Sequence, residues 1–230
     1  MLNLIDLSLY LVLDPELCGG PAEMVRTARL AAKNGATVVQ LRAPDWKKRQ
    51  WLETAVQLKA ALAPLAVPLI INDHVDIALA VDADGVHLGG TDGDLAAARA
   101  ALGPGRVLGA SCYADFALAR AAKAAGADYG AFGAVCASPT KPQAGRASWD
   151  LLTRARDELA VPVCAIGGIT LADAPGLVAA GADLLAVITA LFSTPDLAAR
   201  AELGVPICAI GGISLPMRRA SPPPAPICWR

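Results

Sequence analysis

Short apolar runs alternate with longer segments of helical spacing along most of this chain. The runs span four or five residues, are rich in Val, Ile and Leu, and are followed by short polar or glycine-containing links. Strands that alternate with helices through short links are parallel. The eight predicted strands are Leu9–Leu13, Thr37–Leu41, Val67–Ile71, Gly85–Leu88, Val107–Ala110, Tyr129–Phe132, Pro162–Ile166 and Leu184–Ile188.

Helices are predicted between these strands, and a related motif marks the ends of three of them. Asn34-Gly35-Ala36-Thr37, Ala125-Gly126-Ala127-Asp128 and Ala180-Gly181-Ala182-Asp183 each place a glycine at a helix C-cap, directly before a strand. The segment Pro15–Gly20 is interpreted as a loop. The predicted helices are Ala22–Asn34, Trp46–Ala63, Val75–Val81, Leu95–Leu102, Phe116–Ala125, Trp149–Leu159 and Leu171–Ala180, with Ala190–Leu203 as a candidate eighth.

Eight strand–helix units in one chain of 230 residues predict an α/β fold, a single (β/α)₈ TIM barrel. A doubly wound sheet is the alternative, because the number of strands alone does not prove closure. After the last unit, Glu202–Leu215 repeats Glu158–Leu171 with 11 of 14 positions identical. We therefore predict a catalytic barrel over residues 1–203 and a partly duplicated, Pro-rich tail over residues 204–230 that is not part of it.

Three origins for the repeated segment compete. It is a recent partial duplication, an artefact of the gene sequence or its assembly, or a segment that replaces the seventh strand of a partner chain. The first two are favoured, because a swap must displace a central strand that is already paired.

Composition excludes several classes of protein. The net charge is −1, with 20 basic and 21 acidic residues, so no basic surface for nucleic acid or an anionic membrane is indicated. The six cysteines form no C-x-x-C pair and only two histidines accompany them, which argues against structural zinc and for a reducing compartment. The N-terminal segment lacks a basic region and no apolar run approaches 18 residues. A soluble cytoplasmic protein is expected, and nothing in the sequence excludes a homo-oligomer.

Two aspartates follow neighbouring predicted strands. Asp73 comes after the third strand and Asp92 after the fourth. Because the carboxyl ends of parallel strands meet at one end of a barrel, these carboxylates are expected at one mouth. Two carboxylates together with substrate phosphates are the ligands that suit Mg²⁺. The alternative is that Asp73 caps the following helix and Asp92 begins a surface turn.

Further polar side chains follow other strands at the same mouth. Gln40 and Arg42 share one face of the second strand, and an inward Arg is costly unless it meets an anion. The alternative partner for Arg42 is a nearby carboxylate such as Asp73. Ser111 is expected just after the fifth strand and adds a hydroxyl.

Glycines and hydroxyl groups near the last strands indicate a phosphate site. Gly167 and Gly168 follow the seventh strand, where backbone N–H groups and a helix N-terminus can bind phosphate, and Ile188 and Thr189 end the eighth. The alternative for the glycines is a tight turn. The long connection after the sixth strand offers Ser138, Thr140 and Lys141, although its composition also suits an ordinary solvated loop.

No nucleophile with a partnered base is apparent. His87 lies inside the fourth strand and is interpreted as a hydrogen-bonded core residue, and Cys112 lies beside the site without a histidine base. The combination of carboxylates, cations, hydroxyls and backbone donors instead favours a phosphorylated substrate with a second phosphate on Mg²⁺.

At these residues the chain resembles the thiamine-phosphate synthase family. The resemblance runs from about Tyr10 to Phe192 and rests on several motifs taken together. It implies a barrel that joins 4-amino-5-hydroxymethyl-2-methylpyrimidine diphosphate to 4-methyl-5-(2-phosphoethyl)thiazole, giving thiamine phosphate and pyrophosphate. The motifs are Gln40-Leu41-Arg42, Ile70-Ile71-Asn72-Asp73, Gly85-Val86-His87-Leu88-Gly89 with Asp92, Gly109-Ala110-Ser111, Ser138-Pro139-Thr140-Lys141-Pro142 and Ala165-Ile166-Gly167-Gly168-Ile169-Thr170.

The resemblance also assigns roles to individual residues. It places Mg²⁺ on Asp73 and Asp92, and the pyrimidine diphosphate on Gln40, Arg42, Asn72, Ser111 and Lys141. It places the thiazole phosphate on Ser138, Thr140, Gly168, Ile188 and Thr189. Catalysis is assigned to Arg42, Lys141 and Ser111, which stabilise a leaving pyrophosphate while a pyrimidine carbocation forms, so no general base is required.

The sequence departs from the family pattern at three places. Pro44 stands where the family usually has a Lys, with Lys47 and Lys48 as neighbouring substitutes, Thr189 replaces a Ser, and the duplicated tail is additional. A related thiazole tautomerase uses a His two residues after the strand Ser, and this chain has Tyr113 there. That tautomerase and a catalytically impaired barrel that binds thiazole phosphate are the alternative functions.

Overall fold

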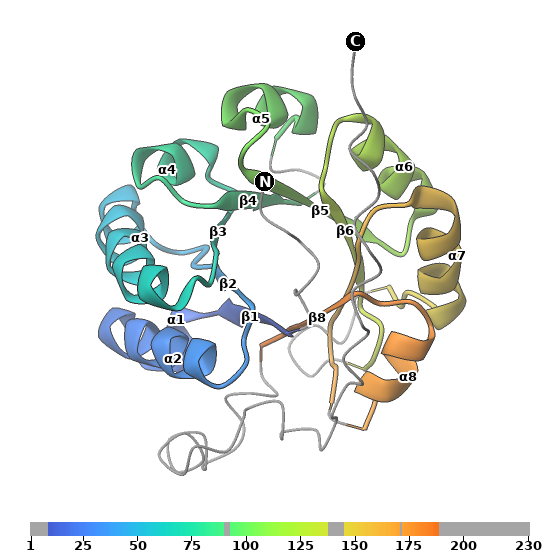
Figure 1. Cartoon of the computed structure of the whole chain (residues 1–230), viewed down its shortest axis with the longest axis horizontal. Helices are drawn as coiled ribbons and strands as arrows, with labels where there is room; N and C mark the ends of the chain where they lie inside the picture. The colour runs from blue at the N-terminus through green and yellow to red at the C-terminus, as the bar shows by residue number, and fades with distance from the viewer. Residues whose placement is uncertain (1–8, 90–92, 138–144, 171, 189–230) are drawn as a thin grey trace.

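The structure is a computed structural model that describes residues 9–89, 93–137, 145–170 and 172–188. Eight parallel strands form a closed barrel in sequence order, and β8 pairs with β1 to complete it (Figure 1). This closure confirms the predicted (β/α)₈ barrel and excludes the doubly wound sheet. The strands are β1 (Leu9–Leu13), β2 (Val38–Leu41), β3 (Leu69–Asn72), β4 (Gly85–Leu88), β5 (Val107–Tyr113), β6 (Tyr129–Gly133), β7 (Val163–Ile166) and β8 (Leu184–Val187).

The helices form a ring around the strands (Figure 1). The bounds of the helices that the sequence predicted, α2 to α8, agree with the prediction to within about three residues. They are α1 (Pro15–Cys18), α2 (Pro21–Lys33), α3 (Lys48–Leu62) with the short 3₁₀ helix η2 (Ala63–Leu65), α4 (Val75–Ala80), α5 (Leu95–Leu102), α6 (Phe116–Ala124), α7 (Trp149–Leu159) and α8 (Ala174–Ala179). The candidate eighth helix and the repeated segment lie outside the described residues.

The prediction of a loop over Pro15–Gly20 is wrong, because the chain forms the single turn α1 there. The Asp14 side chain accepts hydrogen bonds from the backbone N–H groups of Glu16 and Leu17, and Pro15 occupies the first turn. Gly19 then ends the turn in the left-handed conformation, with φ of 81°. Local capping therefore outweighs the loop-like composition of this segment.

Apolar side chains fill both the inside of the barrel and the layer between strands and helices. Alternate strand residues point inward, as the two-residue period of a strand requires. The intervening residues pack against the helices, where Trp51 of α3 is among the largest buried side chains. The inner cluster consists of Tyr10, Val12, Val38, Ile70, Val107, Tyr129, Ala131, Cys164, Leu184 and Ala186.

One polar side chain before every second strand closes the N-terminal end of the barrel. Each accepts a hydrogen bond from the backbone N–H at or near the start of the preceding strand, a donor that the ladder leaves without a partner. Two of the four belong to the repeated Ala-Gly-Ala-Asp motif, and Thr37 belongs to its variant. The pairs are Thr37 with Leu9 at 3.2 Å, Asp84 with Leu69 at 2.8 Å, Asp128 with Leu108 at 2.7 Å, and Asp183 with Val163 at 2.9 Å.

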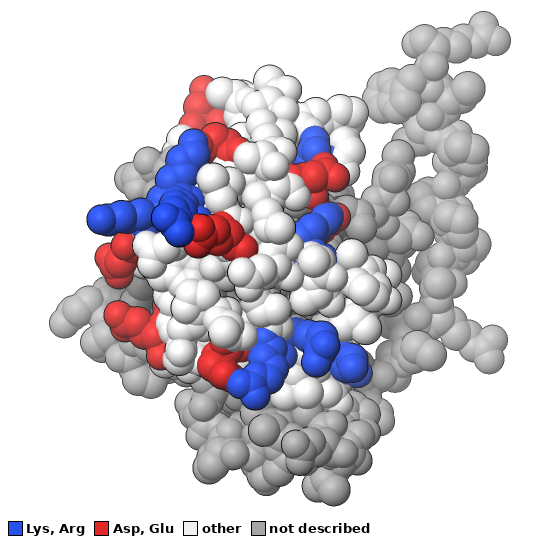
Figure 2. All heavy atoms as spheres, turned by 90° about the vertical axis from the view of Figure 1, so that its left-hand side faces the viewer, with Lys and Arg blue, Asp and Glu red and all other residues white. Residues whose placement is uncertain are grey.

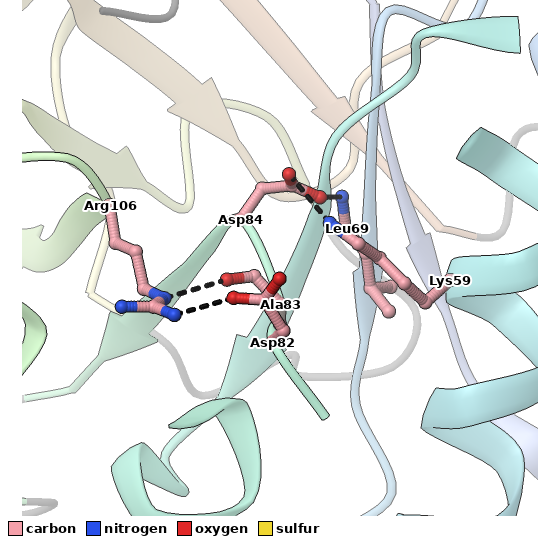
Figure 3. A network of polar contacts seen from close by, with 6 residues as sticks. All are labelled: Lys59, Leu69, Asp82, Ala83, Asp84 and Arg106. Carbon is pink, nitrogen blue, oxygen red and sulfur yellow. Dashed lines mark hydrogen bonds and ion pairs between the residues drawn. The ribbon is translucent and has the colours of Figure 1, made fainter. Parts of the chain in front are cut away.

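Basic side chains complete this end of the barrel. Figure 3 shows Asp84 between Lys59 and the backbone of Leu69, with Lys59 Nζ 2.8 Å from the carboxylate, and Arg106 directed at Asp82 and the carbonyl of Ala83. These residues line a surface cavity of about 440 Å³. Since its charged groups already pair with one another, the cavity reads as a part of the closure.

The outer faces of the helices carry both signs of charge. Figure 2 shows acidic and basic side chains mixed over the face that includes α2, α3 and α4. Close pairs join Arg26 to Glu23 and Lys48 to Asp76. Among the described residues of this face, no single-sign patch forms.

Candidate functional site at the C-terminal mouth

The described site residues come together at the C-terminal ends of the strands. Gln40 and Ser111 lie inside β2 and β5, Asn72 ends β3, and Arg42 and Asp73 follow directly after β2 and β3. Strand register brings them to one end of the barrel, with Asn72 opposite His87. Asp92, Ser138, Thr140, Lys141 and Thr189 lie outside the described residues, so their predicted roles remain predictions.

Gln40 is held in the barrel interior with only 4% of its surface exposed. Its Nε2 donates a hydrogen bond to the hydroxyl of Tyr10, 2.7 Å away. A buried amide without partners would be costly, so this bond fixes the side chain below the mouth.

A chain of hydrogen bonds continues from Tyr10 across the barrel. The hydroxyls of Tyr10 and Tyr129 lie 2.8 Å apart, and the Tyr129 hydroxyl lies 2.9 Å from His87 Nδ1. His87 Nε2 in turn lies 2.9 Å from Ser111 Oγ. The interpretation of His87 as a hydrogen-bonded core residue is thus confirmed, and Gln40 and Ser111 form the two ends of one chain.

Burial keeps the two tyrosines of this hydrogen-bond chain, Tyr10 and Tyr129, protonated. Loss of solvent raises the pKa of both Tyr10 and Tyr129 above the usual value of a phenol. Their rings pack edge to face at 5.9 Å, and His87 stacks on Tyr129 at 5.6 Å. Each phenol therefore carries one proton that it can donate.

Gly109 provides the space that Tyr129 occupies. The two residues are register partners on β5 and β6, and a Cβ on Gly109 would lie 2.1 Å from the Tyr129 ring. Nothing larger than glycine fits there without displacing the ring.

Arg42 meets a carboxylate at the mouth, but not the one that the sequence suggested. Its guanidinium lies 3.7 Å from Asp14, the residue that caps α1, so the alternative of a nearby carboxylate is confirmed, with Asp14 in place of the example Asp73. Both side chains are partly exposed, at 32% and 22%, so this pair is weak and open to exchange with a ligand anion. The arrangement is compatible with the predicted role of Arg42 toward a diphosphate.

Asp73 does not cap the following helix. The N-cap position of α4 belongs to His74, and no side chain of the described residues caps that helix. Asp73 instead adopts φ of 65°, and its backbone N–H donates to the carbonyl of His87 at 2.9 Å. Such a conformation costs of order 1 kcal/mol outside glycine and is often found at functional sites.

Of the two predicted Mg²⁺ ligands, Asp73 is described, whereas Asp92 lies outside the described residues. Within the described part of the chain, no group of three or more His, Cys, Asp or Glu residues could hold a metal ion. The oxygen donor of Asp73 matches the preference of Mg²⁺. The Mg²⁺ site accordingly stays a prediction.

The glycines after β7 join two loops. Gly167 and Gly168 have φ of 97° and 69°, and a Cβ on Gly168 would lie 2.2 Å from the carbonyl oxygen of Ala137. The loop after β6 is bonded to this turn, with Cys136 N–H donating to the carbonyl of Gly167 at 3.0 Å. The tight-turn reading is therefore confirmed. The phosphate reading remains a prediction, supported by the N–H groups of Gly168 and Ile169, which meet no acceptor among the described residues.

The remaining positions at the mouth give smaller corrections. Ser111 lies within β5, which continues to Tyr113, and not after the strand as predicted. Ile188 follows β8 and packs against the inner apolar cluster. Pro44 is exposed, and of the two lysines considered as substitutes, Lys48 pairs with Asp76.

Comparison with known proteins decides the family. The model of the family described as "Thiamine monophosphate synthase" matches residues 9–191. This chain belongs to that family. A thiamine-phosphate synthase of Aromatoleum aromaticum is 51% identical over 173 residues, covering 75% of this chain and 83% of the relative. One of Methylobacillus flagellatus is 50% identical over 178 residues, covering 77% and 85%.

Solved structures agree with this assignment. The thiamine phosphate pyrophosphorylase of Pyrococcus furiosus has a TM-score of 0.76 and 30% identity, covering 90% of this chain and 96% of its own. A 3-hexulose-6-phosphate synthase, at 20% identity and a TM-score of 0.62, shares the fold alone. Membership of the thiamine monophosphate synthase family makes this chain an enzyme of the transferase type. Across the described residues, moreover, every helix is too short or too polar to cross a membrane.

Proposed function

We propose that this protein joins 4-amino-5-hydroxymethyl-2-methylpyrimidine diphosphate to 4-methyl-5-(2-phosphoethyl)thiazole and releases pyrophosphate. The observation that carries the proposal is the meeting of Gln40, Arg42, Asn72, Asp73 and Ser111 at one mouth in a chain of the thiamine monophosphate synthase family. These side chains supply the polar contacts that a diphosphate and an aminopyrimidine require.

In the proposed reaction, the bond between the pyrimidine methylene carbon and the diphosphate oxygen breaks, and its electron pair leaves with pyrophosphate. The thiazole nitrogen then donates its lone pair to that carbon, so no proton has to move. Arg42, Lys141 and Ser111 donate hydrogen bonds to the leaving group, where charge develops. Gln40 and Asn72 orient the pyrimidine diphosphate for attack in line.

Mg²⁺ is part of the proposal, held by Asp73 and Asp92. When bound, it supplies positive charge to the phosphate oxygens of the leaving group. The thiazole phosphate is assigned to Ser138, Thr140, Gly168, Ile188 and Thr189, where backbone N–H groups after β7 support the assignment.

The test is a synthase assay with both substrates and Mg²⁺. Wild-type protein is expected to form thiamine phosphate, and Asp73→Ala to lose nearly all of that activity because a metal ligand is gone. Asp82→Ala is the matched control. Asp82 also has a positive φ, of 53°, but lies at the opposite end of the barrel, so it controls for backbone strain. A wild type that binds the thiazole phosphate and makes no product would refute the synthase.

The remaining expectations on organisation belong to the same proposal. A barrel whose eight strands already close has no edge for a ninth strand, which supports a tail over 204–230 outside it. The proposed cytoplasmic location is supported by the four described cysteines, which are all free thiols. Deleting Gly204–Arg230 is expected to leave soluble, folded protein, and aggregation of the truncated chain would show that the tail is structural.

A further inference from the structure

We infer that the buried chain from Gln40 to Ser111 has a single direction, which holds His87 as the Nε2–H tautomer and turns the Ser111 hydroxyl proton toward the pyrimidine diphosphate. The inference rests on the proposed function for the identity of that ligand. It assigns Tyr10, Tyr129 and His87 as positioning residues, of which only His87 was named from the sequence, as a core residue.

The direction follows from counting protons along the chain. Gln40 Nε2 donates to the Tyr10 hydroxyl, so the Tyr10 proton must point to its other neighbour, the hydroxyl of Tyr129. Tyr129 accepts there and must donate its own proton onward, to His87 Nδ1.

The direction of these hydrogen bonds fixes the tautomer of His87 and, through it, the position of the Ser111 proton at the mouth. A ring whose Nδ1 accepts a hydrogen bond carries its proton on Nε2, which lies 2.9 Å from Ser111 Oγ. Ser111 accepts that bond and keeps its own proton for a ligand. The other neutral tautomer, Nδ1–H, would turn the bond to Tyr129 round, and one of the two phenol protons would then meet no acceptor in the described part of the barrel, which is costly for a buried group.

The chemistry of the ligand requires the same direction. The oxygens of an ionised diphosphate only accept hydrogen bonds. In the opposite direction Ser111 would donate to His87 Nε2 and face the diphosphate with lone pairs. The chain therefore converts Ser111 from a group that can donate either way into a fixed donor toward the leaving group.

The tautomer of His87 can be measured directly, because the protein has only two histidines. Nitrogen-15 NMR of the labelled full-length protein is expected to show His87 as neutral Nε2–H. Tyr129→Phe removes the partner of Nδ1 and is expected to give a mixture of tautomers. Tyr10→Phe is the matched control, since Tyr129 still has a proton to give to Nδ1. An Nδ1–H tautomer or an imidazolium at neutral pH in the wild type would overturn the inference.

A double-mutant cycle tests whether Tyr129 acts through Ser111. The probe is pyrophosphate with Mg²⁺, measured by calorimetry. Tyr129→Phe is expected to weaken its binding about tenfold, the loss of one hydrogen bond to a charged group. In a Ser111→Ala background the same change is expected to have no further effect. Equal losses in both backgrounds, or none in either, would contradict the role.

Two readouts separate this role from a purely structural one and from the proposed function. Binding of 4-methyl-5-(2-phosphoethyl)thiazole is expected to be unchanged in Tyr129→Phe, whereas general damage to the barrel would weaken it as well. Failure of the wild type to make thiamine phosphate refutes the proposed function only. The tautomer and the pyrophosphate cycle are measured without turnover, so they decide this inference separately.

Discussion

The two ends of the barrel use the same residue types for opposite purposes. At the N-terminal end, Asp84, Asp128 and Asp183 each accept a backbone N–H from the neighbouring strand, and Lys59 and Arg99 pair with the first two. At the C-terminal end, the Arg42 guanidinium meets its carboxylate at 3.7 Å and Ser111 ends a hydrogen-bonded chain that opens to the mouth. Polar groups are satisfied internally at one end and kept available for a ligand at the other.

Strand direction explains this difference. Parallel strands present unpaired N–H groups where they begin, and these donors attract carboxylates. Where they end, the following helices and loops point N–H groups at the mouth, which favours anionic ligands. An aspartate is therefore expected to stabilise the fold at the first end and to serve chemistry at the second.

The largest predicted effect comes from a substitution that disrupts the packing of the barrel interior between the two ends. Gly109→Ala places a Cβ 2.1 Å from the Tyr129 ring, so the ring must move and the chain to Ser111 must break. We expect a loss of about 3 kcal/mol in the free energy of unfolding, the upper range for overpacking, together with loss of synthase activity. Urea denaturation measures the first and product formation the second.

The control for this substitution is Gly105→Ala. Gly105 has open space around the added Cβ, and the change is expected to alter stability by less than about 0.5 kcal/mol. If Gly109→Ala were as stable as Gly105→Ala, the ring would not be fixed as the structure has it.

The second prediction separates stability from activity at the N-terminal end. Asp128→Ala leaves the Leu108 N–H without its partner and Arg99 without its carboxylate. The expected loss is about 1–3 kcal/mol of stability, with kcat unchanged within about twofold, because the substitution lies far from the mouth.

Asp157→Ala provides the matched exposed aspartate. Its pair with the adjacent Arg156 lies on the surface, with 60% of the Asp157 side chain exposed, so stability should change by under about 0.5 kcal/mol. A fall in kcat for Asp128→Ala that exceeds the fraction of protein unfolded would show that the two ends are coupled.

The sequence predicted the fold well because its signals were local and repeated. The Ala-Gly-Ala-Asp motif indicated helix ends, and alternation of short runs indicated parallel strands. It did not indicate that Asp128 and Asp183 close the preceding strands, because that contact requires neighbouring strands to be in register. It also missed α1, whose single turn depends on the side-chain cap from Asp14.

The sequence predicted the two ends of the hydrogen-bond chain, Gln40 and Ser111, but not the tyrosines between them. Residues such as Gln40 and Ser111 follow from strand ends, whereas Tyr10 and Tyr129 meet across 119 residues of chain only because the barrel closes. The one local sign was Gly109, a glycine within a strand, which often marks a close approach. The partner of Arg42 was missed together with α1, since no role was predicted from the sequence for Asp14, which caps that turn.

The smallest predicted effect concerns that partner and tests whether the mouth is held ready for an anion. Asp14→Asn keeps an oxygen that can accept from the N–H groups of Glu16 and Leu17, so α1 should persist. It removes the negative charge beside Arg42. Because the pair is partly exposed and its groups are 3.7 Å apart, the gain for a competing diphosphate is small.

Pyrophosphate with Mg²⁺ is expected to bind about twofold to threefold more tightly, by calorimetry at low salt, with the difference fading at high salt. Weaker binding would mean that Asp14 orients Arg42 for the ligand instead of competing with it, and the mouth would then resemble the N-terminal end in fixing its charges internally.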